Sequence, residues 1–115
     1  MTEDLEKVRS LARDLREKES PRSPREKLGG YALAARALDK CRAALVGRQG
    51  EYFSNCPLDQ RWLKFAELDY NAFRDFVATG ATDDQVAGWI GEHAKKRSQA
   101  EIAAWNDREG SVRLS

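Results

Sequence analysis

Residues 31–47 read YALAARALDKCRAALVG, the strongest helical signal in the chain. Alanine and leucine have high helix propensity, and Gly47 is a typical residue to end a helix. One apolar face recurs at helical spacing and consists of Tyr31, Ala35, Leu38 and Leu45. Arg36 and Lys40 are predicted to point away from this face. The segment therefore predicts a long helix packed on one side against a core.

Arg42 falls in the middle of that apolar face. A buried guanidinium is costly unless a carboxylate or several carbonyls satisfy it. Asp39 lies at the edge of the same face, and Glu51 or Asp59 could reach Arg42 from the segment that follows the helix. Two interpretations stay open: an internal ion pair that holds the helices in register, or a pocket whose fixed cation binds a carboxylate or phosphate.

Capping boxes mark three further predicted helix starts. In this motif a serine or threonine and a glutamate or glutamine three residues later satisfy each other's backbone N–H groups. The pairs are Ser23 with Glu26, Thr82 with Gln85, and Ser98 with Glu101. Pro24 suits the first helical position, and Gly29 and Gly30 are expected to interrupt the helix after it. Asp69 is the predicted cap of another helix, which Gly80 ends.

No pair of alternating, strand-like segments occurs, and residues 47–54 indicate a loop or a short extended segment. We therefore predict an all-α fold, a single small domain of five to six helices in an orthogonal bundle. Residues 1–13 are expected to form an N-terminal helical extension. Residues 14–109 are expected to form the helical domain, and residues 110–115 a frayed tail.

The composition argues against several classes of protein. Of the 115 residues, 41% are hydrophobic and 34% are charged, yet the net charge is only +1, far from the basic excess of a nucleic-acid binder. No apolar run reaches the roughly 18 residues of a membrane span, and the N-terminus lacks the apolar core of a secretory signal. Two cysteines and one histidine at unrelated spacings form no zinc motif. We expect a cytoplasmic protein with reduced thiols, no metal or cofactor, and neither a nucleic-acid nor a membrane partner.

Five stretches are similar, in the same order, to a known bacterial family: PRSPREKLGGY, ARALDKCRAAL, GEYFSNCPLDQRWLKF, ATDDQVAGWI and EIAAW. From about residue 14 to residue 105 the sequence resembles the domain of unknown function DUF5069. The resemblance implies a small bacterial helical domain. It implies no activity, so any functional role has to come from the residues themselves.

Candidate ligand-binding residues concentrate in three stretches. Arg22 and Arg25 flank the helix start expected at Pro24, where two guanidinium groups and free N–H groups suit an anion, although a solvated loop is the simpler interpretation. The other two stretches are the helix of Asp39 and Arg42 and the segment 51–61. The candidate set is Arg22, Arg25, Asp39, Arg42, Glu51, Tyr52, Asn55, Asp59 and Arg61. The preferred hypothesis is an Arg/Asp-lined cleft that binds a small anionic ligand or a protein partner without catalysis.

Cys56 supports an alternative hypothesis. If Pro57 is the first residue of a helix, Cys56 occupies its cap position and Asp59 its first turn. The positive helix end favours a nucleophilic thiolate, but Asp59 opposes that field, and Asn55 could cap the helix instead. His93, the one conceivable base, is linked to Cys56 by no known motif. A structural Cys56 is preferred to a reactive thiol. An enzyme that uses Cys56 or paired carboxylates in group transfer, and a purely structural or homodimerisation module, stay open as alternatives.

Overall fold

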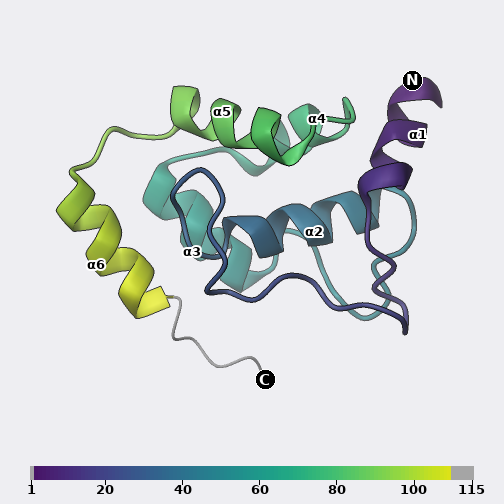
Figure 1. Ribbon diagram of the computed structural model, residues 1–115, viewed down its shortest axis with the longest axis horizontal. Coiled ribbons are helices and arrows are strands. Elements are labelled where there is room, and N and C mark those ends of the chain that lie inside the picture. Colours follow the sequence, from purple (N-terminus) through teal and green to yellow (C-terminus); the bar gives the residue numbers. More distant parts are fainter. Residues whose placement is uncertain (1, 110–115) are drawn as a thin grey trace.

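The computed structural model describes residues 2–109, which form six α-helices joined by turns and loops. The helices are α1 (Thr2–Leu11), α2 (Ala34–Leu45), α3 (Pro57–Ala66), α4 (Tyr70–Val77), α5 (Asp83–His93) and α6 (Gln99–Glu109). The predicted all-α fold is confirmed. Figure 1 shows α2 across the middle of the molecule, α1 at one end and α6 at the other. None of these helices is long and apolar enough to cross a membrane.

The central helix α2 is surrounded on all sides. Every residue from Ala34 to Ala43 is buried, and α1, α3 and α4 all contact this helix. This corrects the prediction that Arg36 and Lys40 point away from the core, since they are 8% and 3% exposed. Irregular chain covers their side of α2, and such chain has no periodicity that would reveal it in the sequence.

The helix predicted to begin at the first capping box does not form. Residues Ser23 to Glu26 make a turn, in which the Glu26 amide donates to the Ser23 carbonyl at 3.0 Å. Leu28 and Tyr31 then exchange two backbone hydrogen bonds of 3.1 Å. Gly29, between them, has a φ of 61°. A Cβ at this position would lie 3.2 Å from the side chain of Ile90 in α5. Left-handed backbone cannot continue a right-handed helix, so α2 begins only after this turn.

The other two capping boxes are confirmed. The Thr82 hydroxyl accepts from the Gln85 amide at 3.2 Å, and the Gln85 side chain accepts from the Thr82 amide at 2.9 Å. Ser98 and Glu101 make the same two bonds, of 3.1 and 3.3 Å. Asp69 caps α4 as predicted. These local interactions begin α4, α5 and α6 independently of what the helices later pack against.

The N-terminal helix packs on α2. It ends at Leu11, two residues before the end of the predicted extension, and Leu15 is buried in the turn that follows. Val8 has no exposed surface, so α1 adds to the core of the domain predicted for residues 14–109. The predicted tail, residues 110–115, lies outside the described residues.

Residues 47–54 form a loop that lies against the segment after α1. The Leu15 amide donates to the Arg48 carbonyl at 2.9 Å, and the Arg48 guanidinium donates to the carbonyls of Arg9 and Ala12 at 3.0 and 3.3 Å. At Gly50, with a φ of 58°, a Cβ would approach the Leu15 carbonyl oxygen to 2.6 Å. Two irregular segments are thus held together beside α2, and they border the cavity described below.

Candidate functional site

Arg42 is an internal ion-pair residue. Its side chain is 5% exposed, and its Nη1 donates to the Asp83 carboxylate at 2.8 Å. Its Nη2 donates to the Ala81 carbonyl at 2.9 Å. The partner of Arg42 is therefore Asp83, at the start of α5. The sequence had suggested Asp39 as the partner, and this expectation is wrong. A carboxylate at that position also faces the positive end of the helix.

Arg22 joins Asp39 to Asp83, the carboxylate that binds Arg42. Its guanidinium binds both oxygens of Asp39 at 3.0–3.2 Å, and its backbone amide donates to the same carboxylate at 2.7 Å. Its Nη1 donates to Asp83 at 2.7 Å. We call Arg22, Asp39, Arg42 and Asp83 the arginine–aspartate cluster. A shallow cavity of about 380 Å³ lies beside it.

The charges of the arginine–aspartate cluster balance one another. Burial works to raise the pKa of Asp83, but hydrogen bonds and charges from Arg22 and Arg42 outweigh it and leave that pKa below its usual value. Burial likewise works to lower the pKa of Arg22, while its two carboxylate partners raise it. Asp83 is shared by Arg22 and Arg42, while Asp39 binds Arg22 and lies 3.7 Å from the Arg13 Nε, and this geometry favours the ion-pair interpretation of Arg42.

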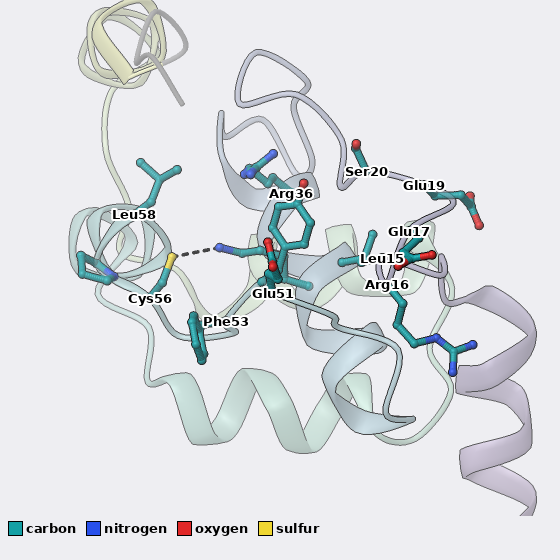
Figure 2. Close-up of a pocket in the computed structure, with 13 residues that line it drawn as sticks. Leu15, Arg16, Glu17, Glu19, Ser20, Arg36, Glu51, Phe53, Cys56 and Leu58 are labelled. Carbon is teal, nitrogen blue, oxygen red and sulfur yellow. Dashed lines mark hydrogen bonds between the residues drawn. The ribbon is translucent and has the colours of Figure 1, made fainter. Parts of the chain in front are cut away.

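A larger cavity, which we call the cleft, lies beside a neighbouring face of α2 and has a volume of about 710 Å³. In Figure 2 the irregular segment that carries Leu15 to Ser20 lies on one side, and Phe53, Cys56 and Leu58 lie on the other, with Arg36 between them. The lining residues are Leu15, Arg16, Glu17, Glu19, Ser20, Arg36, Lys40, Glu51, Tyr52, Phe53, Cys56, Pro57 and Leu58. Its volume is in the range of small-molecule sites.

Arg36 carries a buried positive charge in the cleft. It is 8% exposed. Its Nη1 donates to the Arg22 carbonyl at 3.3 Å, and its guanidinium carbon lies 5.7 Å from the centre of the Tyr52 ring. Its Nε is buried and has no hydrogen-bond partner. Within the described side chains no carboxylate forms an ion pair with it. Arg36 therefore differs from Arg42, whose charge is compensated.

Lys40 connects the cleft to the start of α3. Its side chain is 4% exposed, and its Nζ donates to the Cys56 sulfur at 2.9 Å and lies 3.0 Å from the Asp59 carboxylate. The other Asp59 oxygen accepts from the Asn55 amide at 2.9 Å. Cys56 occupies the cap position as predicted, without a side-chain cap bond. Asn55, the alternative cap, does not cap α3, and its side-chain oxygen accepts from the Gln60 side-chain amide instead.

The two cysteines lie in different environments. Cys41 is 1% exposed in the core, and burial raises the pKa of its thiol to about 11. Cys56 is half-buried, lines the cleft and receives a hydrogen bond from an ammonium group. Only the second environment combines access with positive charge.

Comparison with protein families matches residues 18–113 to the Domain of unknown function (DUF5069). The chain belongs to the DUF5069 family. The resemblance seen in the sequence is confirmed, although the match begins at residue 18 rather than 14 and extends to 113 rather than 105. A search of curated proteins found no match to the chain.

In this DUF5069 domain the predicted site residues do not share one cleft. Arg22, Asp39 and Arg42 belong to the arginine–aspartate cluster. Glu51, Tyr52 and Cys56 line the cleft. Asp59 is buried and forms an ion pair with Lys40. Arg25 belongs to the turn at Ser23, where its amide donates to the serine hydroxyl at 3.2 Å. Arg61 is 56% exposed and pairs with Glu109 of α6 at 3.0 Å. Within the described part of the chain no group of three or more histidine, cysteine or acidic residues could hold a metal ion.

Sequence reasoning missed Arg36, Lys40 and Asp83. Helical periodicity predicts that Arg36 and Lys40 face solvent, because the segments that cover them are irregular and leave no periodic signal in the sequence. Asp83 did carry a signal, since it follows a capping threonine. That position indicates only the start of a helix, and nothing local indicates that two arginines from distant segments bind its carboxylate.

Proposed function

We propose that the cleft of this DUF5069 domain binds a small molecule through an anionic group, with Arg36 as its counter-charge. The burial of Arg36 without a carboxylate partner is the observation that carries this proposal. A buried guanidinium is unfavourable unless an opposite charge and hydrogen bonds satisfy it. One carbonyl at 3.3 Å and an aromatic ring leave that requirement incomplete. A carboxylate or phosphate beside α2 would complete it.

The remaining lining supports a ligand of mixed polarity. Glu19 and Glu51, which both line the cleft, are exposed carboxylates that suit an ammonium or hydroxyl group. Phe53 is 76% exposed and offers an apolar surface. Amino-acid-like or peptide-like zwitterions combine these features, with a carboxylate for Arg36 and an ammonium for the glutamates. Multiply charged anions fit less well, because the acidic side chains repel them.

Other interpretations of the sequence stay predictions. They are a protein partner, a homodimer, a purely structural module, a cytoplasmic location and a bacterial origin. The arginine–aspartate cluster, in which Arg22 binds Asp39 and Asp83 and Arg42 also binds Asp83, supports a role in holding α2 to α5. We therefore assign the proposed anion-binding role to Arg36 rather than to Arg42.

Thermal unfolding with a panel of probes tests the proposal. The panel contains glutamate, glutathione, phosphate and citrate, together with chloride as an ionic-strength control. A probe at about 100 times its Kd should stabilise the protein by about 2.7 kcal/mol, which raises Tm by about 10 °C in a domain of this size. Arg36→Met should abolish the increase, whereas Arg61→Met, which alters an exposed arginine outside the cleft, should retain it.

Two results would contradict the proposal. One is an unchanged Tm with every carboxylate and phosphate probe, together with no co-purified small molecule in native mass spectrometry. The other is an equal rise of Tm in wild type and Arg36→Met, since the anion would then bind elsewhere.

A further inference from the structure

We propose that Cys56 is a reversible covalent modification site, whose thiol exchanges with small disulfides that carry carboxylates and forms a mixed disulfide inside the cleft. The inference rests on the anion-binding role of Arg36 proposed above. It adds a covalent step and a class of reactant to that role.

The environment of Cys56 favours a nucleophilic sulfur. Lys40 Nζ donates to its sulfur at 2.9 Å, the bond drawn as a dashed line in Figure 2, and the lysine side chain is 4% exposed. An adjacent ammonium group and a helix N-terminus are typical neighbours of reactive cysteines. Cys56 has both, since α3 begins at the next residue. Asp59 shares Lys40 at 3.0 Å, but one of its oxygens also binds the Asn55 amide.

The cleft gives a bound molecule access to this sulfur. Cys56 is half-buried and lines the same cavity as Arg36. Arg36 is the independent sign of a ligand there, because its side chain is 8% exposed and its Nε has no partner. A carboxylate paired with Arg36 would hold a small disulfide within the cavity that contains the thiol.

Thiol–disulfide exchange fits these neighbours better than acyl transfer. Acyl transfer from cysteine uses a general base and oxyanion donors. Lys40 is engaged as a donor to both Cys56 and Asp59. His93 stacks on Trp89 with ring centres 4.7 Å apart, and its Nδ1 lies 2.8 Å from the carbonyl oxygen of that residue. Exchange requires only a nucleophilic sulfur, access and a leaving thiol.

The step balances without any further reactant. The Cys56 sulfur attacks one sulfur of the incoming disulfide, and a new S–S bond joins the two. The original S–S bond breaks, and the other half leaves as a thiolate that takes up the proton lost by Cys56. The incoming disulfide is the oxidant, and one of its halves is released as a free thiol. A second molecule of that thiol reverses the step.

Three disulfides that differ in charge test the proposal. Oxidised glutathione is anionic, bis(2-hydroxyethyl) disulfide is neutral and cystamine is cationic. Mixed-disulfide formation is followed by intact mass at constant pH in a Cys41→Ser background, which leaves one thiol, and N-acetylcysteine is the reference. The protein should react faster than the reference with the neutral disulfide. Its preference for the anionic over the neutral disulfide should exceed that of the reference by at least about tenfold, or about 1.4 kcal/mol.

Variants separate the two parts of the proposal. Arg36→Met should lose the anionic preference, measured as the ratio of its rates with the anionic and the neutral disulfide, and Arg36→Lys should restore part of that ratio. Lys40→Met should slow all three reactions. If Lys40→Met does not fold, Lys40→Gln serves the same purpose. Arg61→Met should match the parent, and circular dichroism confirms the helical content of each variant.

Each failure has a distinct meaning. If Cys56 reacts no faster than N-acetylcysteine with any disulfide, the covalent step is overturned, while anion binding is judged separately from the Tm measurements. If Cys56 reacts fast without charge preference, or if Arg36→Met keeps the preference, the assignment of carboxylate-bearing disulfides is overturned. An unchanged rate in the lysine variants would overturn the role of Lys40.

Discussion

Replacement of Arg42 by methionine should destabilise the protein, whereas the same replacement of Arg36 on the same helix should not. Both guanidinium groups are buried in α2. Methionine keeps a long unbranched side chain and a comparable helix propensity, so the two variants differ mainly in the partners that each arginine leaves behind.

The cost at Arg42 follows from its contacts. The Ala81 carbonyl would lose its donor in a residue that is 3% exposed, and an unpaired buried acceptor costs about 1–3 kcal/mol. The Asp83 side chain is 42% exposed and keeps Arg22, so solvent limits this part of the loss to about 1 kcal/mol. The substitution also removes a buried charge and the unpaired Nε of Arg42, which restores about 1 kcal/mol of stability. The net loss is about 2 kcal/mol, or about 8 °C in Tm.

The balance at Arg36 is different. The variant loses one carbonyl bond of 3.3 Å and one ring contact at 5.7 Å, together worth about 2 kcal/mol. Relief from burying an uncompensated charge is of at least that size. In the absence of ligand the free energy of unfolding should therefore stay level or rise by about 1 kcal/mol.

Urea unfolding, followed by circular dichroism and tryptophan fluorescence, measures both variants. Combining each with Asp83→Asn gives a double-mutant cycle. Arg42 should couple to Asp83 by about 1 kcal/mol and Arg36 by less than the error of the measurement. Equal destabilisation by the two substitutions would refute the distinction between a paired and an unpaired buried arginine, and with it the basis of the proposed site.

Three further predictions concern acid, the loop and the thiols. Because the pKa of Asp83 lies below its usual 3.8 in the folded protein, its contribution to stability is present above that value and is lost as pH falls through the folded pKa. The urea midpoint should therefore drop below about pH 4, and less steeply in Asp83→Asn. Gly50→Ala should lower the free energy of unfolding by about 3 kcal/mol, because the new Cβ would lie 2.6 Å from a carbonyl oxygen. Gly47→Ala should lower it by only about 1 kcal/mol, because its Cβ would meet nothing within 4 Å. Equal urea midpoints for the two variants would contradict this prediction. Iodoacetamide at pH 8 should label Cys56 and spare Cys41, whose pKa is about 11, and rapid labelling of both thiols in the folded protein, seen by peptide mapping, would be inconsistent with the structure.

Sequence alone predicted what depends on neighbours along the chain. The Thr82–Gln85 and Ser98–Glu101 boxes and the Pro57 start involve residues within one turn, and all of them form. The box at Ser23 failed because Gly29 and the residue after it adopt left-handed backbone. The capping motif covers only residues 23–26, so it contains no information about the backbone conformation of the glycines that follow.

The candidate site was less predictable because it depends on tertiary structure. The burial of Arg42 followed from helical periodicity, but its partner Asp83 comes from another helix. Arg36 and Lys40 are covered by chain that crosses α2 without repeating structure. Cys56 was placed correctly at the start of its helix, and its distinguishing neighbour, Lys40, is sixteen residues away in the sequence.

Three cations inside one helix should shape how this domain tolerates substitution. Arg36, Lys40 and Arg42 occupy interior positions of α2 beside Leu38 and Cys41. In a saturation mutagenesis scan scored by growth or abundance, these three basic positions should therefore tolerate as few substitutions as Leu38 does. Exchange of arginine for lysine at Arg42 should count as a severe change, since a single ammonium cannot reproduce two divergent donors. Substitution matrices treat arginine and lysine as interchangeable surface residues. Such matrices would give misleading alignment scores for distant members of this family at these three positions.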